Sequence, residues 1–322
     1  MIYFLYFCNV MRYLGELISL GVACSWTITA IVSEVGTKRM GVLNFNTWRL
    51  GAALLFSTIL SFVLTGSFLP AYAGVDAWLW MLLSGVIGYF FGDFCLFKSY
   101  LYISSRYGQL FMTLAPAAAA FVAWLALGQV LTIGNVIAML VTLSGIAIAV
   151  LSKEEGQKKL VFNLPWKGIL YGIGAGLGQG TGLVLSKIGM EHYERNIPVT
   201  MIEGMKDIIP FEANLIRCIA GFSCFFITVL LSKGGKQLFA KINDGVSARS
   251  VLTAVMFGPF LGVGFSLMAV QYTHVGIAQT LMSLTPILII FPSYWIFKQP
   301  ITLKAIVGAL VSVLGASLFF LI

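Results

Sequence analysis

Charged residues are scarce in this chain. Only 10% of its 322 residues are Asp, Glu, Lys or Arg, whereas a soluble domain carries about 25%. Hydrophobic residues make up 59%, against roughly 45–50% in soluble proteins. So few charges cannot cover the surface of so apolar a chain in water. The composition therefore excludes an ordinary soluble fold and indicates an integral membrane protein.

The residue clusters that hold metals, nucleotides or nucleic acids are also missing. The five cysteines show no CxxC spacing and are expected to be small buried hydrophobes. His192 and His274 stand alone near span ends, and the glycines from Gly172 to Gly182 lack the Lys-Ser/Thr ending of a phosphate loop. The net charge of +8 comes from dispersed single residues. We therefore expect no metal, no cofactor, no nucleic-acid partner and no catalytic residue.

Ten apolar runs approach the roughly 20 residues that an α-helix needs to cross a bilayer. They lie at about 14–36, 46–65, 77–99, 106–126, 132–151, 167–189, 212–231, 249–271, 276–296 and 303–322. The pattern predicts an all-α integral membrane protein with ten transmembrane helices and the lipid bilayer as its surroundings. The expected location is the cell membrane, crossed many times, and specifically the cytoplasmic membrane of a bacterium.

The first residues form an N-terminal extension, 1–13. Residues 1–10 are apolar but too short to span a membrane, and they lack the basic front end and cleavage site of a signal peptide. Met11 directly precedes the first long run and is an alternative start.

The last third of the chain repeats its middle without a gap. When 88–152 is aligned with 258–322, 15 of 65 positions are identical and most others exchange one apolar residue for another. Fainter matches, at offsets of 153 and 168 residues, pair 33–36 with 186–189 and 46–49 with 214–217.

These matches divide the chain into two five-helix repeats, 14–151 and 167–322, joined by a linker loop, 152–166. Because five is odd, the second repeat must enter the membrane in the opposite sense to the first. The expected architecture is therefore two inverted repeats around a shared site, which suits a carrier that opens alternately to each side.

The repeated residues resemble the EamA family of the drug/metabolite transporter superfamily over about 14–322. The resemblance rests on matching positions in the two repeats: Tyr102, Gln109, Pro116 and the Gly128-Gln129-Val130-Leu131 turn, then Tyr272, Gln279, Pro286 and Lys298-Gln299-Pro300-Ile301. It implies ten helices and the transport of small metabolites such as amino acids without ATP hydrolysis.

The chain also departs from that family. Gln129 and Gln299 stand where members commonly have Glu, and Glu34 stands where they often have Lys. Small multidrug members of the superfamily use a span-one Glu for proton coupling, but Trp26 and its mirror Gln179 cannot titrate. Proton-coupled multidrug exchange through such a Glu is therefore not expected.

Asp93 is the outstanding candidate for the substrate pathway. A carboxylate well inside a span costs about 2.5–3.5 kcal/mol on insertion scales, so a functional placement is favoured. It could bind a cationic group or exchange a proton. The alternative is an internal ion pair, for which Lys98 is poorly placed because it lies five residues on and about 140° around the helix.

Four charged residues occupy equivalent turns and are expected to have structural roles. Glu34 and Arg49 could bridge the hairpin between the first two spans or reach the interface, and Lys187 and Arg217 occupy the equivalent turn.

Uncharged polar and sulfur-containing residues complete the predicted pathway. Gln109, Met112 and Thr113 recur as Gln279, Met282 and Ser283 at spacings of three and four, which place them on one helical face. Helix packing is the alternative reading of this face. Weaker candidates are Trp26, Thr29, Gln179, Gln271, Tyr102 and Tyr272.

Orientation depends on which argument is weighted more. If each Lys or Arg is assigned to its nearest span end, 15 of 20 lie on one side. The positive-inside rule then places both termini outside, whereas the family resemblance implies both inside.

The favoured function is a secondary carrier of small solutes, with amino acids and related amphipathic molecules as the expected class and a proton or another ion as a candidate partner. One copy suffices for a pathway, and a homodimer is compatible with the sequence. The alternative is a membrane protein that does not transport, either a structural partner or an intramembrane enzyme. An enzyme is disfavoured because Asp93 is the only deep carboxylate that the sequence identifies.

Overall fold

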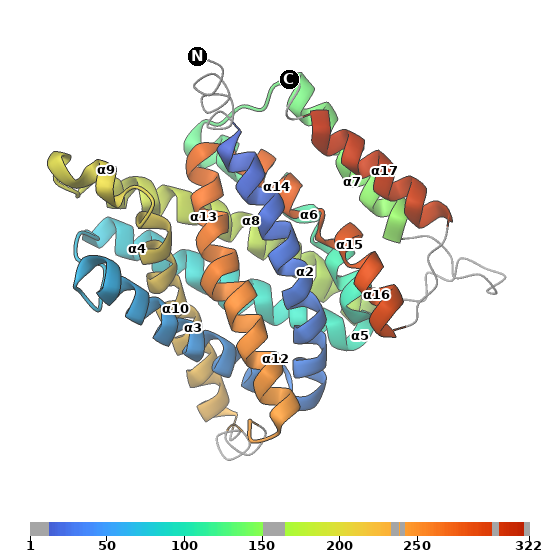
Figure 1. Ribbon diagram of the computed structural model, residues 1–322, viewed down its shortest axis with the longest axis horizontal. Coiled ribbons are helices and arrows are strands. Elements are labelled where there is room, and N and C mark those ends of the chain that lie inside the picture. The colour runs from blue at the N-terminus through green and yellow to red at the C-terminus, as the bar shows by residue number, and fades with distance from the viewer. Residues whose placement is uncertain (1–12, 151–164, 233–237, 239–241, 298–302, 319–322) are drawn as a thin grey trace.

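The computed structural model describes residues 13–150, 165–232, 238, 242–297 and 303–318. Every regular element within these ranges is helical (Figure 1). The N-terminal extension before residue 13 and nearly all of the expected 152–166 linker lie outside the described residues.

The first half contains α2 (Leu14–Met40), α3 (Val42–Thr65), α4 (Val75–Ser84), η1 (Gly85–Gly92), α5 (Asp93–Phe111), α6 (Leu114–Leu127) and α7 (Ile133–Val150). The second half contains α8 (Trp166–Arg195), η2 (Val199–Met201), α9 (Ile202–Met205), α10 (Ile209–Leu231), α12 (Gly245–Val255), η3 (Met256–Phe260), α13 (Leu261–Tyr272), α14 (Val275–Met282), α15 (Thr285–Leu288), α16 (Ile290–Phe297) and α17 (Leu303–Leu318).

Seven helices of the described chain are long and apolar enough to cross a membrane, and they coincide with seven of the ten expected spans. They are Leu14–Met40, Val42–Thr65, Val75–Ser105, Tyr107–Leu127, Trp166–Arg195, Ile209–Leu231 and Gly245–Tyr272. At the other three expected positions lie shorter apolar helices: Ile133–Ile148, Val275–Leu288 and Ile306–Leu318. The protein is therefore a multi-pass membrane protein.

Local backbone preferences set several helix ends. A single residue, Gly41, separates α2 from α3 with φ +82°, a region that L-residues with a side chain rarely adopt. The expected break near Ser104 is present, because Ser104 itself has φ 63° inside α5. The freed amide of Ser105 donates to Oε2 of Glu34 at 2.9 Å, which ties this break to α2.

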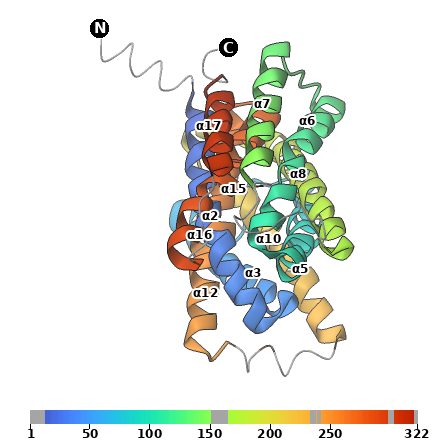
Figure 2. The same cartoon turned by 90° about the vertical axis from the view of Figure 1, so that its right-hand side faces the viewer.

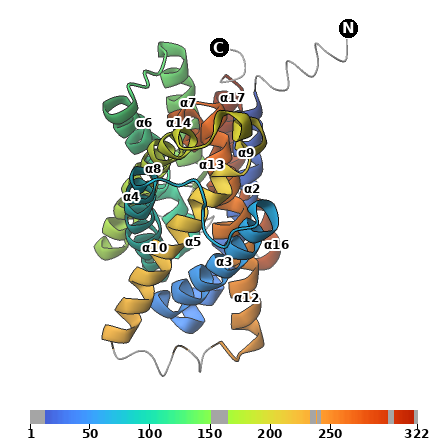
Figure 3. The same ribbon diagram turned by 90° about the vertical axis from the view of Figure 1, so that its left-hand side faces the viewer.

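The first helix of each half packs on the third span of the other half. The glycine-rich α8 lies along α4, η1 and α5, while α2 lies along α12 and α13 (Figure 1). The second spans, α3 and α10, lie against each other (Figures 1 and 3). The last helices, α7 and α17, form a pair at one side of the molecule (Figures 1 and 2).

The glycines of α8 allow this close packing. A Cβ on Gly180 would lie 2.4 Å from the carbonyl oxygen of Ala115, and one on Gly182 would lie 2.8 Å from Cα of Gly88. Both distances are shorter than a real Cβ contact, so only glycine fits at these two positions. α8 is nevertheless one continuous helix, which favours a packing role for its glycines over an unwound segment.

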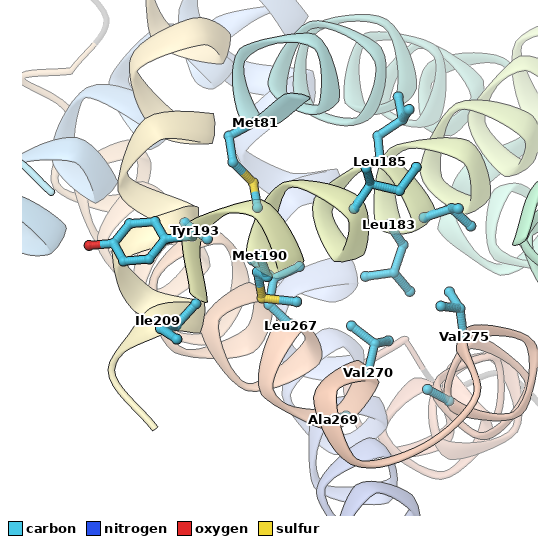
Figure 4. Packing of buried hydrophobic residues seen from close by; sticks show 14 of the residues in the cluster. Met81, Leu183, Leu185, Met190, Tyr193, Ile209, Leu267, Ala269, Val270 and Val275 are labelled. Carbon is cyan, nitrogen blue, oxygen red and sulfur yellow. The ribbon is translucent and has the colours of Figure 1, made fainter. Parts of the chain in front are cut away.

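A buried apolar cluster surrounds the middle of α8. Figure 4 shows Met81 of α4 reaching toward α8, while Leu267 and Val270 of α13 face α8 from the opposite side. Leu183 and Met190 supply the α8 side of this contact. The cluster therefore joins helices of both halves.

Both halves contain a π-helical stretch at the same place in the repeat. η1 covers residues 85–92 and η3 covers 256–260, and these stretches correspond at the offset of 170 residues. π-helical turns often occur at functional sites. Here both stretches border the cavity described next.

Candidate functional site

A small cavity lies in the interior between helices of both halves. Its volume is about 60 Å³. Roughly 10–15 Å³ is enough to hold one water molecule. Its wall combines aromatic and apolar side chains with a few polar and charged groups: Trp26, Thr29, Ala30, Arg49, Tyr89, Asp93, Leu96, Phe97, Tyr100, Gln109, Met112, Gln179, Gly258 and Val263. A wall of this kind is typical of small-molecule sites.

A buried ion pair joins Arg49 of α3 to Asp93 of α5 in this wall. The two residues are only 3% and 5% exposed. Nε2 of Gln179 on α8 donates to Oδ1 of Asp93 at 2.6 Å, so helices of both halves hold the carboxylate. Nε of Arg49 donates to Oδ1 of Asn46 at 3.2 Å. This network satisfies the charges in an environment where an unpaired charge is strongly destabilising.

The ion pair corrects one expectation, the bridge between Glu34 and Arg49. Arg49 does not bridge to Glu34 across the hairpin, because Asp93 takes its guanidinium. Glu34 instead pairs with Lys38 at 2.5 Å on the same helix. The counter-ion of Asp93 comes from α3 rather than from Lys98, which stacks over the Phe94 ring.

Arg217 of α10 occupies the position equivalent to Arg49 but has a different environment. Its guanidinium carbon lies 4.7 Å from the centroid of the Tyr89 ring, and the residue is only 3% exposed. Arg217 therefore does not reach the interface. Lys187, from the same equivalent turn, donates to the carbonyl oxygen of Val270 at 2.5 Å.

Tyr89 connects the cavity to the second half. Its hydroxyl donates to Oδ1 of Asn214 at 2.6 Å and contacts the carbonyl oxygen of Pro259 at 3.3 Å. Nδ2 of Asn214 also donates to the Pro259 carbonyl, at 2.5 Å. The Pro259 carbonyl, in the π-helical stretch η3, therefore accepts from side chains of both halves.

The cavity brings together six of the residues that the sequence suggested for the pathway: Trp26, Thr29, Asp93, Gln109, Met112 and Gln179. They come from both halves of the chain. Nε2 of Gln109 donates to the Tyr100 hydroxyl at 2.6 Å, so this glutamine positions a second aromatic residue of the wall.

The remaining suggested residues lie elsewhere. Gln279, Met282 and Ser283 are buried in the packing around α14, and the hydroxyl of Thr113 donates to the Leu110 carbonyl. Tyr102 stacks on Tyr171 outside the cavity. Gln271 and Tyr272 border a second hollow of about 290 Å³ with Gln129, Lys187, Thr273 and His274.

Several wall residues did not emerge from the sequence, namely Tyr89, Phe97, Tyr100 and Val263. The repeated glycines of Gly88-Tyr-Phe-Phe-Gly92 and Gly258-Pro-Phe-Leu-Gly262 were the available signal for Tyr89. The three other residues look like ordinary apolar or aromatic span residues.

A sequence profile of the EamA-like transporter family matches residues 13–151 and 166–321. A solved structure described only as "Crystal structure of protein" is similar in fold, with a TM-score of 0.64 and 17% sequence identity. The similarity covers 96% of this chain and 97% of the solved one. A search of curated proteins returned no match.

Proposed function

Because the chain belongs to the EamA-like transporter family, we propose that it is a secondary carrier of small amphipathic metabolites. It works by alternating access in the cytoplasmic membrane, with a proton or another ion as its candidate coupling partner. The observation that carries this proposal is the cavity with the buried Arg49–Asp93 pair, which is built from both halves.

The proposal includes ten spans, with the three shorter apolar helices also crossing the membrane, and two inverted halves. Reciprocal packing at glycines supports the inversion. Four glycines of the first half lie beside a residue of the second half, and the four equivalent glycines of the second half lie beside the equivalent residues of the first. The pairs are Gly15–Thr273 with Gly168–Ile103, Gly88–Arg217 with Gly258–Arg49, Gly92–Gln179 with Gly262–Trp26, and Gly145–Ser312 with Gly315–Thr142. A two-fold axis between the halves produces such reciprocity, and inverted repeats with a site at their interface are how many carriers are built.

Alternating access follows from this arrangement. Equivalent helices can exchange their conformations, which moves the opening of the cavity from one side of the membrane to the other. A buried, fully partnered ion pair at the centre suits a site that is closed to water during the exchange.

Flux through the purified protein tests the proposal. The full chain is reconstituted in liposomes and offered a panel of radiolabelled amino acids, small carboxylates and cationic amphiphiles, with and without a pH gradient. We expect uptake of at least one solute class above protein-free liposomes. No flux for any class would refute the proposal.

A pair of tryptophan variants provides the matched control. Gly258→Trp places a large side chain in the cavity wall and should abolish flux. Gly204→Trp adds the same side chain where a Cβ meets no atom within 4 Å and should leave flux unchanged.

A further inference from the structure

Arg217 of α10 is a buried cation. Among the described residues, no carboxylate lies within ion-pair distance of its guanidinium. Its Nε is buried and has no hydrogen-bond partner. The Tyr89 ring, on which Arg217 stacks, attracts the guanidinium but does not neutralise its charge. A buried charge left in this condition is unfavourable unless another group completes the site.

The equivalent residue, Arg49, shows what is missing. Asp93 and Gln179 compensate Arg49 within the protein. The position 170 residues after Asp93 is Val263, which also lines the cavity. The second half therefore has an apolar side chain where the first half has its acid. The charges that act on Tyr89 are two guanidinium groups, of Arg217 and Arg49, and one carboxylate, of Asp93.

Arg217 lies directly behind the wall of the cavity. Its guanidinium packs on the Tyr89 ring, and that ring lines the cavity. A Cβ on Gly88 would lie 2.8 Å from Nη2 of Arg217, so a side chain at this place in η1 would require the guanidinium to shift. A shift of the Tyr89 side chain would bring the cavity into contact with Arg217.

We propose that Arg217 binds the carboxylate of the transported solute, which supplies the missing counter-ion. The apolar part of the solute then packs among Trp26, Leu96, Phe97, Met112 and Val263 in the cavity wall. The planar guanidinium matches a carboxylate through two parallel hydrogen bonds. This assignment rests on the proposed carrier function and narrows its substrate class to small carboxylates with an apolar body.

Ligand-dependent thermal stability of the purified full chain tests the assignment. The probes are 4-methylpentanoate and its uncharged analogue of nearly equal shape, 4-methylpentanamide, with sodium chloride as a separate titration. We expect the carboxylate to raise Tm and the amide to have at least about tenfold weaker potency, since a hydrogen bond to a charged group contributes roughly 1.5–3 kcal/mol. Equal protection by acid and amide, or protection by chloride alone, would overturn the assignment.

Two variants locate the effect. Arg217→Gln should remove the preference for the acid. Val263→Asp gives Arg217 an internal carboxylate at the position equivalent to Asp93, and it should weaken the response to 4-methylpentanoate at least about tenfold. If Arg217→Gln does not fold, Val263→Asp still decides the question. An unchanged preference for the acid in Val263→Asp, or in a folded Arg217→Gln, would overturn the proposal.

Flux separates this inference from the carrier function. Carboxylate-specific stabilisation without flux of any solute would leave the anion site intact and refute the carrier. Flux confined to neutral or cationic solutes, unaffected by Val263→Asp, would retain the carrier and refute the anion site.

Discussion

Arg49 and Arg217 come from the same Asn-x-x-Arg segment written twice, and they lie in different surroundings. Arg49 pairs with an acid from another helix of its own half, and a glutamine from the second half supports that acid. Arg217 stacks on an aromatic ring of the first half and meets no described acid. Asp93 supplies the acid in the first half, and the equivalent residue of the second half is Val263. The comparison teaches that a duplicated framework can keep its packing while the two copies diverge in charge.

The largest loss of stability is expected when Asp93, the acid that pairs with Arg49, is replaced. Asp93→Asn leaves Arg49 buried without a counter-ion, and breaking a buried pair in this way costs about 3–5 kcal/mol. The thermal stability of the purified protein should fall strongly, and flux or its pH dependence should change.

The double variant Arg49→Met with Asp93→Val is the control for this prediction. It removes both charges and should recover much of the lost stability, because well-packed apolar replacements of a buried pair are often neutral. A double variant as unstable as Asp93→Asn would contradict the ion-pair explanation. Unaltered transport in Asp93→Asn would leave the aspartate with a packing role alone.

A smaller loss of stability is expected when the hydrogen bond from Gln179 to Asp93 is removed. Gln179→Leu keeps the approximate size of the side chain but removes the amide that donates to Asp93 at 2.6 Å. A hydrogen bond to a charged group contributes about 1.5–3 kcal/mol, so Tm should fall by less than in Asp93→Asn. The double variant Gln179→Leu with Asp93→Asn should lose less than the sum of the single changes. Additive losses would indicate that the two residues act independently.

The closer packing of α8 compared with α2 provides the third test. Gly180 and Gly182 are equivalent to Thr27 and Thr29 of α2 at the offset of 153 residues. Gly180→Ala places a methyl 2.4 Å from a backbone carbonyl, and such overpacking costs about 1–3 kcal/mol. Thermal stability should fall, whereas Gly21→Ala on α2, where a Cβ meets nothing within 4 Å, should change it little. Equal effects of the two alanines would contradict the close approach of α8.

The smallest loss of stability is expected at the exposed ion pair between Arg39 of the first half and Asp244 of the second. Asp244 pairs with Arg39 at 2.7 Å and accepts a hydrogen bond from the amide of Val246 at the start of α12. Its hydrogen bond with Ser247 lowers the pKa of this carboxyl below its ordinary value. Solvent screens such a pair, so Asp244→Ala should lower Tm only slightly and leave flux intact. A fall in Tm as large as that caused by Asp93→Asn would show that the Arg39–Asp244 pair is needed to hold the two halves together.

Much of the fold could be predicted from the sequence because span length and apolar content are local properties. Seven of the ten expected spans match long apolar helices, and the expected break near Ser104 is present. At the other three expected positions, the described chain has apolar helices of 10–17 residues.

The candidate site could be predicted only in part. Asp93 stood out as a charge deep in an apolar run, and Gln179 as a polar residue at a repeated position. The partner of Asp93 did not, because Arg49 lies 44 residues away on another helix. Tyr89 and Val263 were hidden for a different reason: aromatic and aliphatic residues are common in membrane spans, and nothing local marks those that border a cavity.

Composition and periodicity alone determined that this chain enters a membrane and that it carries two copies of one helical unit. The first property follows from the apolar content of neighbouring residues, and the second follows from the similarity between two segments of the sequence. Tertiary structure decided which charges are neutralised and which is not. That outcome depends on which helices the packing brings together, because Arg49 of α3 meets Asp93 of α5 whereas Arg217 of α10 pairs with no described acid.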